Sequence, residues 1–181
     1  MEYTVNGNDI KFFCDDFDLS ETLDCGQAFR WKKYENGFKG FALDKPLYIE
    51  QNGNEFTLKD VSEDDFLFFW KDYFDLDTDY AHLKKIYSSD KTLKSACEYA
   101  GGIRLLRQDT WETLISFIIS QNNNIPRIKG IIENMCNMFG GFPTAEKLSL
   151  CTENDIAPLR TGFRAKYILD AANAVNEGRV V

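Results

Sequence analysis

Residues 27–58 read QAFRWKKYENGFKGFALDKPLYIEQNGNEFTL, a stretch rich in aromatic and branched residues that turn signals interrupt twice. Both interruptions contain an Asn-Gly pair, at 36–37 and at 52–53. An Asn-Gly pair adopts the left-handed backbone that a two-residue hairpin turn requires, so strand-like residues on both sides of it indicate a β-hairpin. Two such hairpins in succession predict an antiparallel sheet.

Strand-like composition extends toward the N-terminus, and helical spacing follows the hairpins. Residues 3–13 (YTVNGNDIKFF) are strand-like, and residues 16–26 (DFDLSETLDCG) are typical of a short helix that Gly26 ends. From Ser62 onward, apolar residues recur every three to four positions, the period of a helix with one buried face. The predicted fold is α+β, with an antiparallel sheet first and helices after it. The predicted helices cover 62–74, 78–88, 90–100, 109–120, 125–139, 144–150, 152–160 and 164–178.

Three consecutive asparagines, Asn122 to Asn124, separate two of these helices in the stretch SFIISQNNNIPRIKG (116–130). Asn124 is placed to cap the helix that Pro126 helps to start, because Asn is a preferred N-cap and Pro is tolerated in the first turn. Asn123 is expected to bond the backbone of the turn. Asn122 is left without a structural task.

Charge is unevenly distributed along this chain of net charge −8. Residues 1–100 hold 12 Lys and Arg against 21 Asp and Glu, whereas residues 101–181 hold 9 against 8. A polyanion is therefore expected to meet the second half, although a solvated acidic face explains the first half equally well. Six of the nine basic residues in the second half are arginines, and five of these, at 104, 107, 127, 160 and 164, lie near predicted helix ends.

Several classes of protein and site are not expected from this sequence. No apolar run approaches the roughly 20 residues of a membrane span, and the N-terminus has neither the basic nor the apolar region of a signal peptide. The five cysteines form no C-x-x-C pair, which predicts reduced thiols in the cytoplasm (at the nucleoid in a bacterium) and no metal site. The lone histidine, His82, supports no catalytic triad. Local motifs alone leave an α+β domain of unknown activity.

Four further stretches, taken together, carry a family resemblance: CGQAFRW (25–31), GGIRLLRQD (101–109), SFIISQNNNIPRI (116–128) and TGFRAKY (161–167). In this order and spacing they resemble the N-terminal two thirds of the 8-oxoguanine DNA glycosylases, base-excision enzymes of the helix-hairpin-helix superfamily. The resemblance implies a TATA-binding-protein-like antiparallel sheet domain over residues 1–100, packed against a helical domain. Residues 101–181 would form the first part of that helical domain. The resemblance implies double-stranded DNA containing 8-oxoguanine opposite cytosine as partner, and no cofactor.

The resemblance gives Gly26 a role in recognising the damaged base. In the family, the backbone carbonyl of the matching glycine accepts a hydrogen bond from N7–H, a donor that oxidised guanine has and normal guanine lacks. Normal guanine would place two acceptors against each other, at a cost of about 1–3 kcal/mol. An alternative reading is that Gly26 only ends the preceding helix. The two readings are compatible, since a capping glycine exposes its backbone.

The resemblance also assigns residues to the base pair that the flipped lesion leaves behind. It places Asn122 in the gap, Arg127 and Arg164 on the orphaned cytosine, and Phe163 as an aromatic wedge in the stack. Guanidinium groups suit this task, because cytosine N3 and O2 are acceptors and arginine is a permanently charged multiple donor. The family commonly has tyrosine at the position of Phe163, so the stacking surface is kept and the hydroxyl is lost. Alternatively, both arginines are surface residues in helix first turns and Phe163 belongs to the core.

Family members cleave the glycosidic bond with a lysine that forms a Schiff base and follows a Gly-rich hairpin, with an aspartate further on. This sequence ends at NEGRVV, before either motif, so the chain alone is expected to be inactive. A truncated piece of a full glycosylase/lyase is the preferred interpretation. A naturally short gene and a non-catalytic DNA- or protein-binding module are the alternatives. Truncation would expose an apolar face for contacts with a partner, formed by Ile168, Ala171, Ala172 and Val175.

Overall fold

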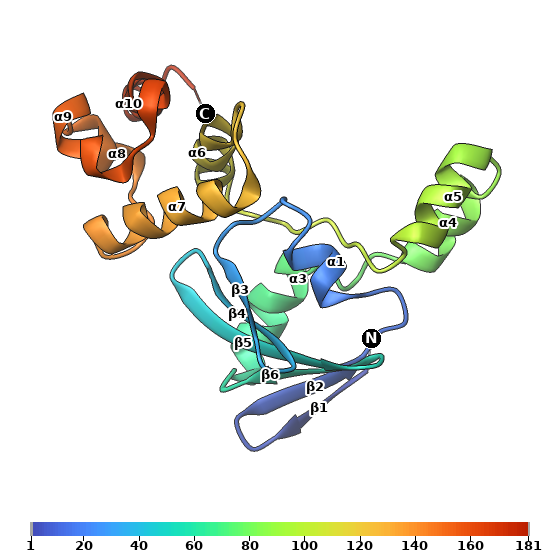
Figure 1. Cartoon of the computed structure of the whole chain (residues 1–181). Coiled ribbons are helices and arrows are strands. Elements are labelled where there is room, and N and C mark those ends of the chain that lie inside the picture. Colours follow the sequence, from blue (N-terminus) through green and yellow to red (C-terminus); the bar gives the residue numbers. More distant parts are fainter. Residues whose placement is uncertain (1, 181) are drawn as a thin grey trace. The chain divides into compact units, whose positions relative to one another are not determined.

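The computed structural model describes residues 2–180, and the chain divides into two compact units. Unit 1 runs to Arg107 and contains the whole sheet, and unit 2 begins at Gln108 and is helical (Figure 1). The α+β fold predicted from the sequence is confirmed.

The sheet of unit 1 has six antiparallel strands in the order β1-β2-β6-β5-β4-β3. Both predicted Asn-Gly hairpins are present, one between β3 and β4 and one between β5 and β6. Gly53 has φ 60° in the second turn, whereas Gly37 begins β4, where a Cβ would lie 1.9 Å from the Ile49 carbonyl oxygen of β5. The positive φ in the first turn, 47°, belongs to Glu35. The strands are β1 (Tyr3–Asn6), β2 (Asp9–Phe13), β3 (Trp31–Tyr34), β4 (Gly37–Ala42), β5 (Lys45–Asn52) and β6 (Glu55–Lys59).

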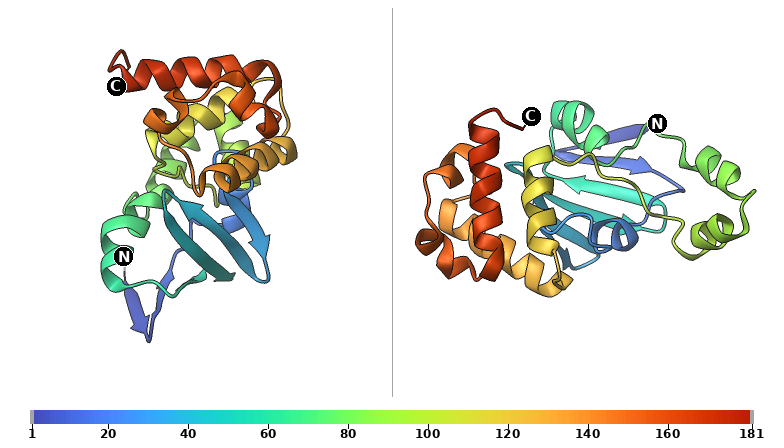
Figure 2. Two further views of the ribbon diagram at one scale, coloured as in Figure 1. Left: turned by 90° about the vertical axis from the view of Figure 1, so that its left-hand side faces the viewer. Right: turned by 90° about the horizontal axis from the view of Figure 1, so that it is seen from above.

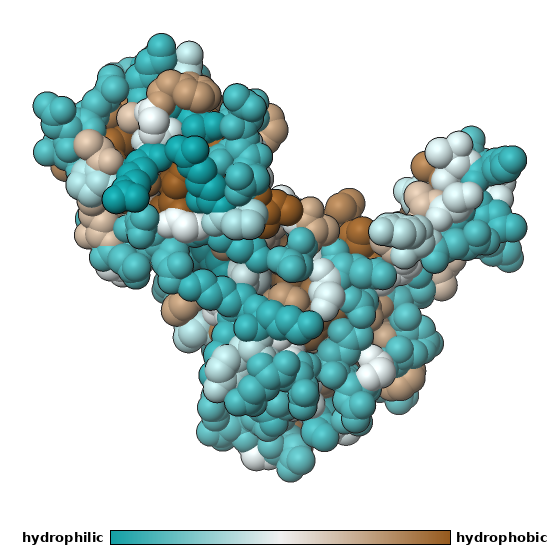
Figure 3. All heavy atoms as spheres, in the orientation of Figure 1, coloured by the Kyte–Doolittle hydropathy of each residue, from teal (hydrophilic) through white to brown (hydrophobic). Residues whose placement is uncertain are grey.

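One face of the sheet carries the core of unit 1, and hydrophilic residues dominate the part of unit 1 seen at the bottom of Figure 3. The core is covered by α1 (Leu19–Leu23) and by a continuous helical element composed of α2 (Glu63–Asp65), η1 (Phe66–Trp70) and α3 (Lys71–Tyr73). Trp31 is 0% exposed, and its indole N–H donates to the Tyr73 hydroxyl at 2.9 Å. The buried indole therefore links the sheet to the helical layer.

The predicted helix over 62–74 begins where expected but contains a π-helical turn in its middle. Ser62 caps it, since the hydroxyl accepts from the Asp65 amide at 3.1 Å. Phe66, Trp70 and Phe74 lie four residues apart and are at most 1% exposed. Residues four positions apart lie on one face of a helix, which places all three side chains in the core.

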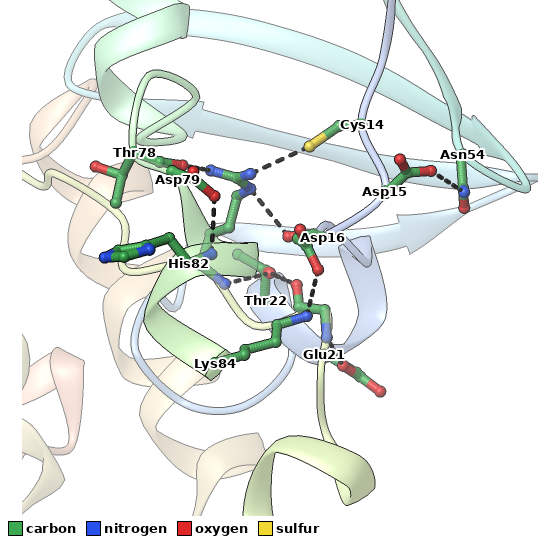
Figure 4. Close-up of polar contacts among 12 residues, drawn as sticks. Cys14, Asp15, Asp16, Glu21, Thr22, Asn54, Thr78, Asp79, His82 and Lys84 are labelled. Carbon is green, nitrogen blue, oxygen red and sulfur yellow. Dashed lines mark hydrogen bonds and ion pairs between the residues drawn. The ribbon is translucent and has the colours of Figure 1, made fainter. Parts of the chain in front are cut away.

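Helices α4 (Tyr80–Tyr87) and α5 (Lys91–Tyr99) form a hairpin in which no residue is fully buried (Figure 1). Asp79 caps α4 by accepting from the His82 amide at 2.9 Å, and Lys84 pairs with Asp16 at 2.5 Å (Figure 4). His82 thus lies in an exposed helix first turn, as a structural rather than catalytic histidine would.

Unit 1 extends past the predicted boundary at residue 100 because buried polar contacts attach residues 102–107 to it. Arg104 is 3% exposed, and its guanidinium is paired on every side. The Leu106 amide donates to the Gln27 side chain at 3.1 Å. The acceptors around Arg104 are the carbonyl oxygens of Asp16, Asp75 and Thr78 and the sulfur of Cys14, three of which Figure 4 labels.

Unit 2 has a core of its own, built mainly from the predicted apolar faces of its helices. The longer helices are α6 (Thr110–Ser120), α7 (Ile125–Phe139) and α10 (Ala165–Asn176). The shorter ones are α8 (Ala145–Ser149), α9 (Glu153–Ile156), η2 (Ala157–Leu159) and η3 (Gly162–Arg164). The fully buried apolar side chains are Ile115, Ile119, Ile128, Ile131, Ile132, Met135, Leu148, Ile156, Leu159, Ile168 and Ala172.

Four residues of the last helix were expected to form an exposed apolar face, and the structure buries two of them. Ile168 and Ala172 are 0% exposed, because α8 packs against that side of α10. Ala171 and Val175 line an apolar groove of about 530 Å³ between α10 and α6, which lie side by side in Figure 2. Among the described residues, no helix is both long and apolar enough to cross a membrane.

The carboxylate of Asp75 makes the acid stability of unit 1 testable. Burial alone would raise the pKa of Asp75, but hydrogen bonds from Arg107, Thr78 and Tyr80 outweigh it and hold the pKa below its usual value. A lowered folded-state pKa contributes stability above the unfolded-state pKa of about 3.9, and this contribution is lost as pH falls through the folded-state value.

We therefore expect Asp75→Asn to destabilise unit 1 by about 1.5–3 kcal/mol at neutral pH. The difference from the unmodified protein should persist down to about pH 5 and shrink below about pH 4, where the native carboxyl also becomes protonated. Urea denaturation over a pH series measures this. Asp44→Asn removes an exposed carboxylate and is the control. A difference that stays constant down to pH 3 would contradict the assignment.

Candidate nucleic-acid interface

The turn between α6 and α7 uses its three asparagines in three different ways. Asn124 Oδ1 accepts from the Arg127 amide at 3.0 Å and caps α7. Asn123 donates through Nδ2 to the Ile119 carbonyl at 3.0 Å, which ties the turn to the end of α6. Both structural assignments are confirmed. Asn122 is exposed and has φ 49°, and its side chain bonds to nothing among the described residues.

A second turn, at residues 160–164, presents an aromatic ring to solvent. Arg160 and Gly162 have φ 57° and 62°, so the backbone is in the left-handed region at two of three successive residues. Phe163 is 59% exposed, and the only aromatic ring that it contacts in the described part of the chain is that of Tyr167, edge-on at 6.5 Å between centroids. The alternative that Phe163 belongs to the core is therefore wrong.

Arg164 joins the two turns from a buried position. The residue is 4% exposed, and its guanidinium lies 4.4 Å from the Phe163 ring. It donates to the Asn122 carbonyl at 3.0 Å, to the Thr161 carbonyl at 3.2 Å and, through both Nε and Nη2, to the Gln121 carbonyl. The alternative that Arg164 is a surface residue is wrong, and most of its donors have acceptors within the protein.

Arg127 lies in the first turn of α7 and is exposed. Its guanidinium makes one long contact, from Nη2 to the Arg160 carbonyl at 3.5 Å. The helix dipole mildly disfavours a cation at this end, so the helix itself gains nothing from the charge. Arg127 therefore offers an extended fork of donors to a ligand.

In unit 1, the predicted lesion contact Gly26 lies just after α1 with φ 93°, a conformation that glycine adopts without strain. Among the described residues, no group donates a hydrogen bond to its carbonyl oxygen. The neighbouring Gln27 donates to the carbonyls of Thr22 and Arg104 at 2.9 and 2.8 Å. The loop is therefore held on both sides of the glycine.

The role of Gln27 was not predicted from the sequence. Its only local signal is a polar amide between a glycine and the strand-like AFRW. The partners that explain it lie 77 and 79 residues away along the chain.

Fewer of the five arginines at 104, 107, 127, 160 and 164 are available to a polyanion than the sequence indicated. Arg104 is buried in unit 1, and Arg107 forms an ion pair with Asp75 at 2.8 Å. Arg164 is buried in unit 2, which leaves Arg127 and Arg160 as the members of the set that are exposed and form no ion pair among the described residues. Arginine count along a sequence overestimates the charge offered to a polyanion, because buried guanidinium groups are already paired.

Comparison with known proteins places both units in base-excision repair families. A model of the 8-oxoguanine DNA glycosylase N-terminal domain matches residues 10–114. A model of HhH-GPD superfamily base excision DNA repair proteins matches residues 115–179.

Two relatives are DNA glycosylases by name. The N-glycosylase/DNA lyase of Saccharomyces cerevisiae is 32% identical over 182 residues, which cover 85% of this chain and 48% of the yeast protein. N-glycosylase/DNA lyase OGG1 of Arabidopsis thaliana is 27% identical, with 92% of this chain and 50% of the plant protein covered. The chain spans about half the length of the curated relatives it matches.

Two similar solved structures contain DNA. MBOgg1 in complex with a low-affinity DNA ligand matches with a TM-score of 0.94 and 42% identity, over 100% of this chain and 68% of MBOgg1. The 8-oxoguanine glycosylase/lyase of Clostridium acetobutylicum, bound to double-stranded DNA with cytosine opposite 8-oxoguanine, matches with a TM-score of 0.93 and 36% identity. That match covers 100% of this chain and 67% of the clostridial chain.

The division of tasks within the triplet can be tested by stability. Asn124→Ala should lower the free energy of unfolding of unit 2 by about 0.5–2 kcal/mol, because α7 loses its cap. Asn122→Gly is the control, because glycine adopts the left-handed backbone of residue 122 (φ 49°) without strain, and it should change the free energy of unfolding by less than about 0.5 kcal/mol. Urea unfolding can be followed through the NMR signal of the Trp111 indole N–H, which donates to Pro143 within unit 2. Equal losses in the two variants would show that the assignment is wrong.

Proposed function

The chain belongs to the 8-oxoguanine DNA glycosylase family, and on that premise we propose that it recognises 8-oxoguanine opposite cytosine as part of a DNA N-glycosylase/AP lyase. One observation carries this proposal. An exposed amide (Asn122), an exposed guanidinium (Arg127) and an exposed ring (Phe163) lie on two linked turns of unit 2. Among the described residues, the Asn122 side chain makes no hydrogen bond and the Arg127 guanidinium makes one long one, of 3.5 Å.

These groups match what a duplex requires when one nucleotide leaves it. A flipped base leaves a gap and an unpaired partner, and both must be compensated by the protein. Asn122 is free to enter the gap, because its side chain has no bond to break. Phe163 can stack against the neighbouring base from its exposed position, as apolar wedges do in other kinked duplexes.

The exposed guanidinium of Arg127 is the group best suited to the unpaired cytosine. Cytosine presents N3 and O2 as adjacent acceptors, and a guanidinium fork offers two parallel donors. Arg164 was predicted as a second cytosine contact, but four of its five N–H groups already donate to backbone carbonyls. Arg127 therefore accounts for most of the preference for cytosine in this proposal.

In unit 1, the Gly26 carbonyl is proposed to accept from N7–H of the flipped base. Its carbonyl oxygen has no donor among the described residues. The side chain of the next residue, Gln27, holds the loop through bonds to the carbonyls of Thr22 and Arg104. A free acceptor in a fixed loop favours a base with a donor at N7 and disfavours normal guanine by the cost of two facing acceptors.

Arg127→Ala tests the cytosine contact. The preference of the protein for 8-oxoguanine opposite cytosine over 8-oxoguanine opposite adenine should fall by roughly 10- to 150-fold, the equivalent of one charged hydrogen-bond pair. Fluorescence anisotropy with the two duplexes measures it. Arg179→Ala removes an equal charge from the exposed Arg179–Glu177 pair and should weaken both duplexes alike. An unchanged preference in Arg127→Ala would overturn the assignment.

We further propose that these 181 residues do not by themselves cleave the glycosidic bond. The lysines of unit 2 are Lys129, Lys147 and Lys166, and none lies in a Gly-rich hairpin of the type that precedes the Schiff-base lysine in the family. Lys147 donates to the Phe139 carbonyl at 2.7 Å, and Lys166 lies over the Tyr167 ring at 4.8 Å. Both contacts are typical of surface lysines.

Borohydride trapping on a duplex with 8-oxoguanine opposite cytosine checks this, and we expect no covalent adduct with the chain. A trapped adduct would refute the proposed inactivity. Absence of an adduct together with equal binding of damaged and undamaged duplexes would favour the rival function, a non-catalytic DNA- or protein-binding module.

A further inference from the structure

We propose that Gln27 is a positioning residue for lesion recognition, whose side chain fixes the direction of the Gly26 carbonyl and thereby sets the preference for 8-oxoguanine over guanine. The inference rests on the proposed function, in which that carbonyl accepts from N7–H of the flipped base. It adds a residue that acts on the base only through its neighbour in the chain.

The first step is the covalent link between the two residues. The Gly26 carbonyl and the Gln27 N–H belong to one planar peptide unit, so the carbonyl can turn only if the whole unit turns with it. Gly26 itself does little to prevent that rotation, because glycine, here at φ 93°, moves among many backbone conformations without strain. The direction of the carbonyl is therefore fixed mainly from the Gln27 side of the peptide.

The second step is the anchoring of the Gln27 side chain. Nε2 donates to the Thr22 carbonyl at 2.9 Å and to the Arg104 carbonyl at 2.8 Å. Oε1 accepts from the Leu106 amide at 3.1 Å. An amide group that is held through its nitrogen and its oxygen at once cannot swing away without leaving backbone groups unpaired.

The third step concerns the backbone groups that Gln27 pairs with. Thr22 lies in the last turn of α1, where carbonyl groups lack partners within the helix. Arg104 and Leu106 are 3% and 8% exposed and lie in a segment that is neither helix nor strand. Gln27 therefore replaces a neighbouring strand for that segment and a further helical turn for α1. Buried backbone groups on both sides resist its displacement.

The fourth step is that these anchoring groups are themselves held in place. Thr22 is 0% exposed, and its hydroxyl donates to the Gly102 carbonyl at 3.0 Å and accepts from the Arg104 amide at 3.1 Å. A Cβ on Gly102 would lie 2.4 Å from the Asp18 side chain, so the two segments pack without space between them. Gln27 thus ties its peptide to a fixed support.

Gln27→Met tests the inference with the complete 181-residue chain, because methionine keeps the length of the side chain and removes its hydrogen bonds. The ratio of the dissociation constants for guanine–cytosine and 8-oxoguanine–cytosine duplexes should fall about 5-fold, since a carbonyl that turns no longer opposes the acceptor of normal guanine. Binding of the undamaged duplex should become no weaker. Fluorescence anisotropy measures both constants.

Gln51→Met, in β5 of the same unit, is the matched control. Gln51 accepts from the Leu19 amide at 2.9 Å and donates to the Gly53 carbonyl at 3.1 Å, so this variant also loses bonds between an amide side chain and the backbone. It should leave the ratio of the two dissociation constants unchanged. An unchanged ratio in Gln27→Met, or an equal fall in both variants, would overturn the inference.

A measurement without DNA separates failure of this inference from failure of the proposed function. The NMR order parameter of the Gln27 backbone N–H reports the motion of the peptide that carries the Gly26 carbonyl. It should be about 0.85 in the unmodified chain and in Gln51→Met, and below about 0.6 in Gln27→Met. A value below about 0.6 in the unmodified chain, or an unchanged value in Gln27→Met, would refute positioning.

If Gln27→Met does not fold, Gln27→Glu takes its place in both measurements, because it keeps the acceptor for Leu106 and loses the donors. Gln51→Glu is then the control of equal charge. A rigid Gln27 peptide in an unmodified chain that does not prefer 8-oxoguanine would contradict the proposed function and leave the positioning itself supported.

Discussion

A guanidinium group that leaves water must donate its N–H groups to acceptors inside the protein, and each unit of this chain is organised around one such group. In unit 1, Arg104 binds three backbone carbonyls and a sulfur, and so attaches the segment that ends the unit. In unit 2, Arg164 binds carbonyls from two turns. Both arginines donate mainly to backbone carbonyls that lie outside regular helices and strands.

This constraint separates residues that hold the interface from residues that form it. Asn123 and Asn124 bond the backbone of their own turn, whereas Asn122 keeps its amide free. Arg164 is buried and paired, whereas Arg127 is exposed with a single long contact. In each set, identical side chains have different functions because their surroundings offer different numbers of acceptors. The groups left unpaired at the surface are the ones available to a ligand.

The features that were predicted correctly depend on interactions over a few residues. The Asn-Gly pairs mark the hairpins, whose turns are residues 35–36 and 53–54, and side chains such as those of Ser62 and Asn124 cap helices through bonds to amides three residues away. The features that were missed depend on distant partners. The π-helical turn was not indicated by the apolar spacing, and the burial of Ile168 and Ala172 depends on α8. Nothing within a short window of sequence reports such contacts.

For the candidate site, the resemblance to a family was sufficient to nominate Gly26, Asn122, Arg127, Phe163 and Arg164, since the motifs that carry it are contiguous. Spacing could not distinguish which arginine is exposed, because burial results from chain segments that meet only in the folded state. The acceptors of Arg164 include carbonyls 42 and 43 residues away, and carbonyls carry no side-chain signature in a sequence. Contiguous motifs therefore nominate the candidate site residues. Long-range packing decides which of these residues are exposed and which are buried, because only packing determines which polar groups remain without a partner.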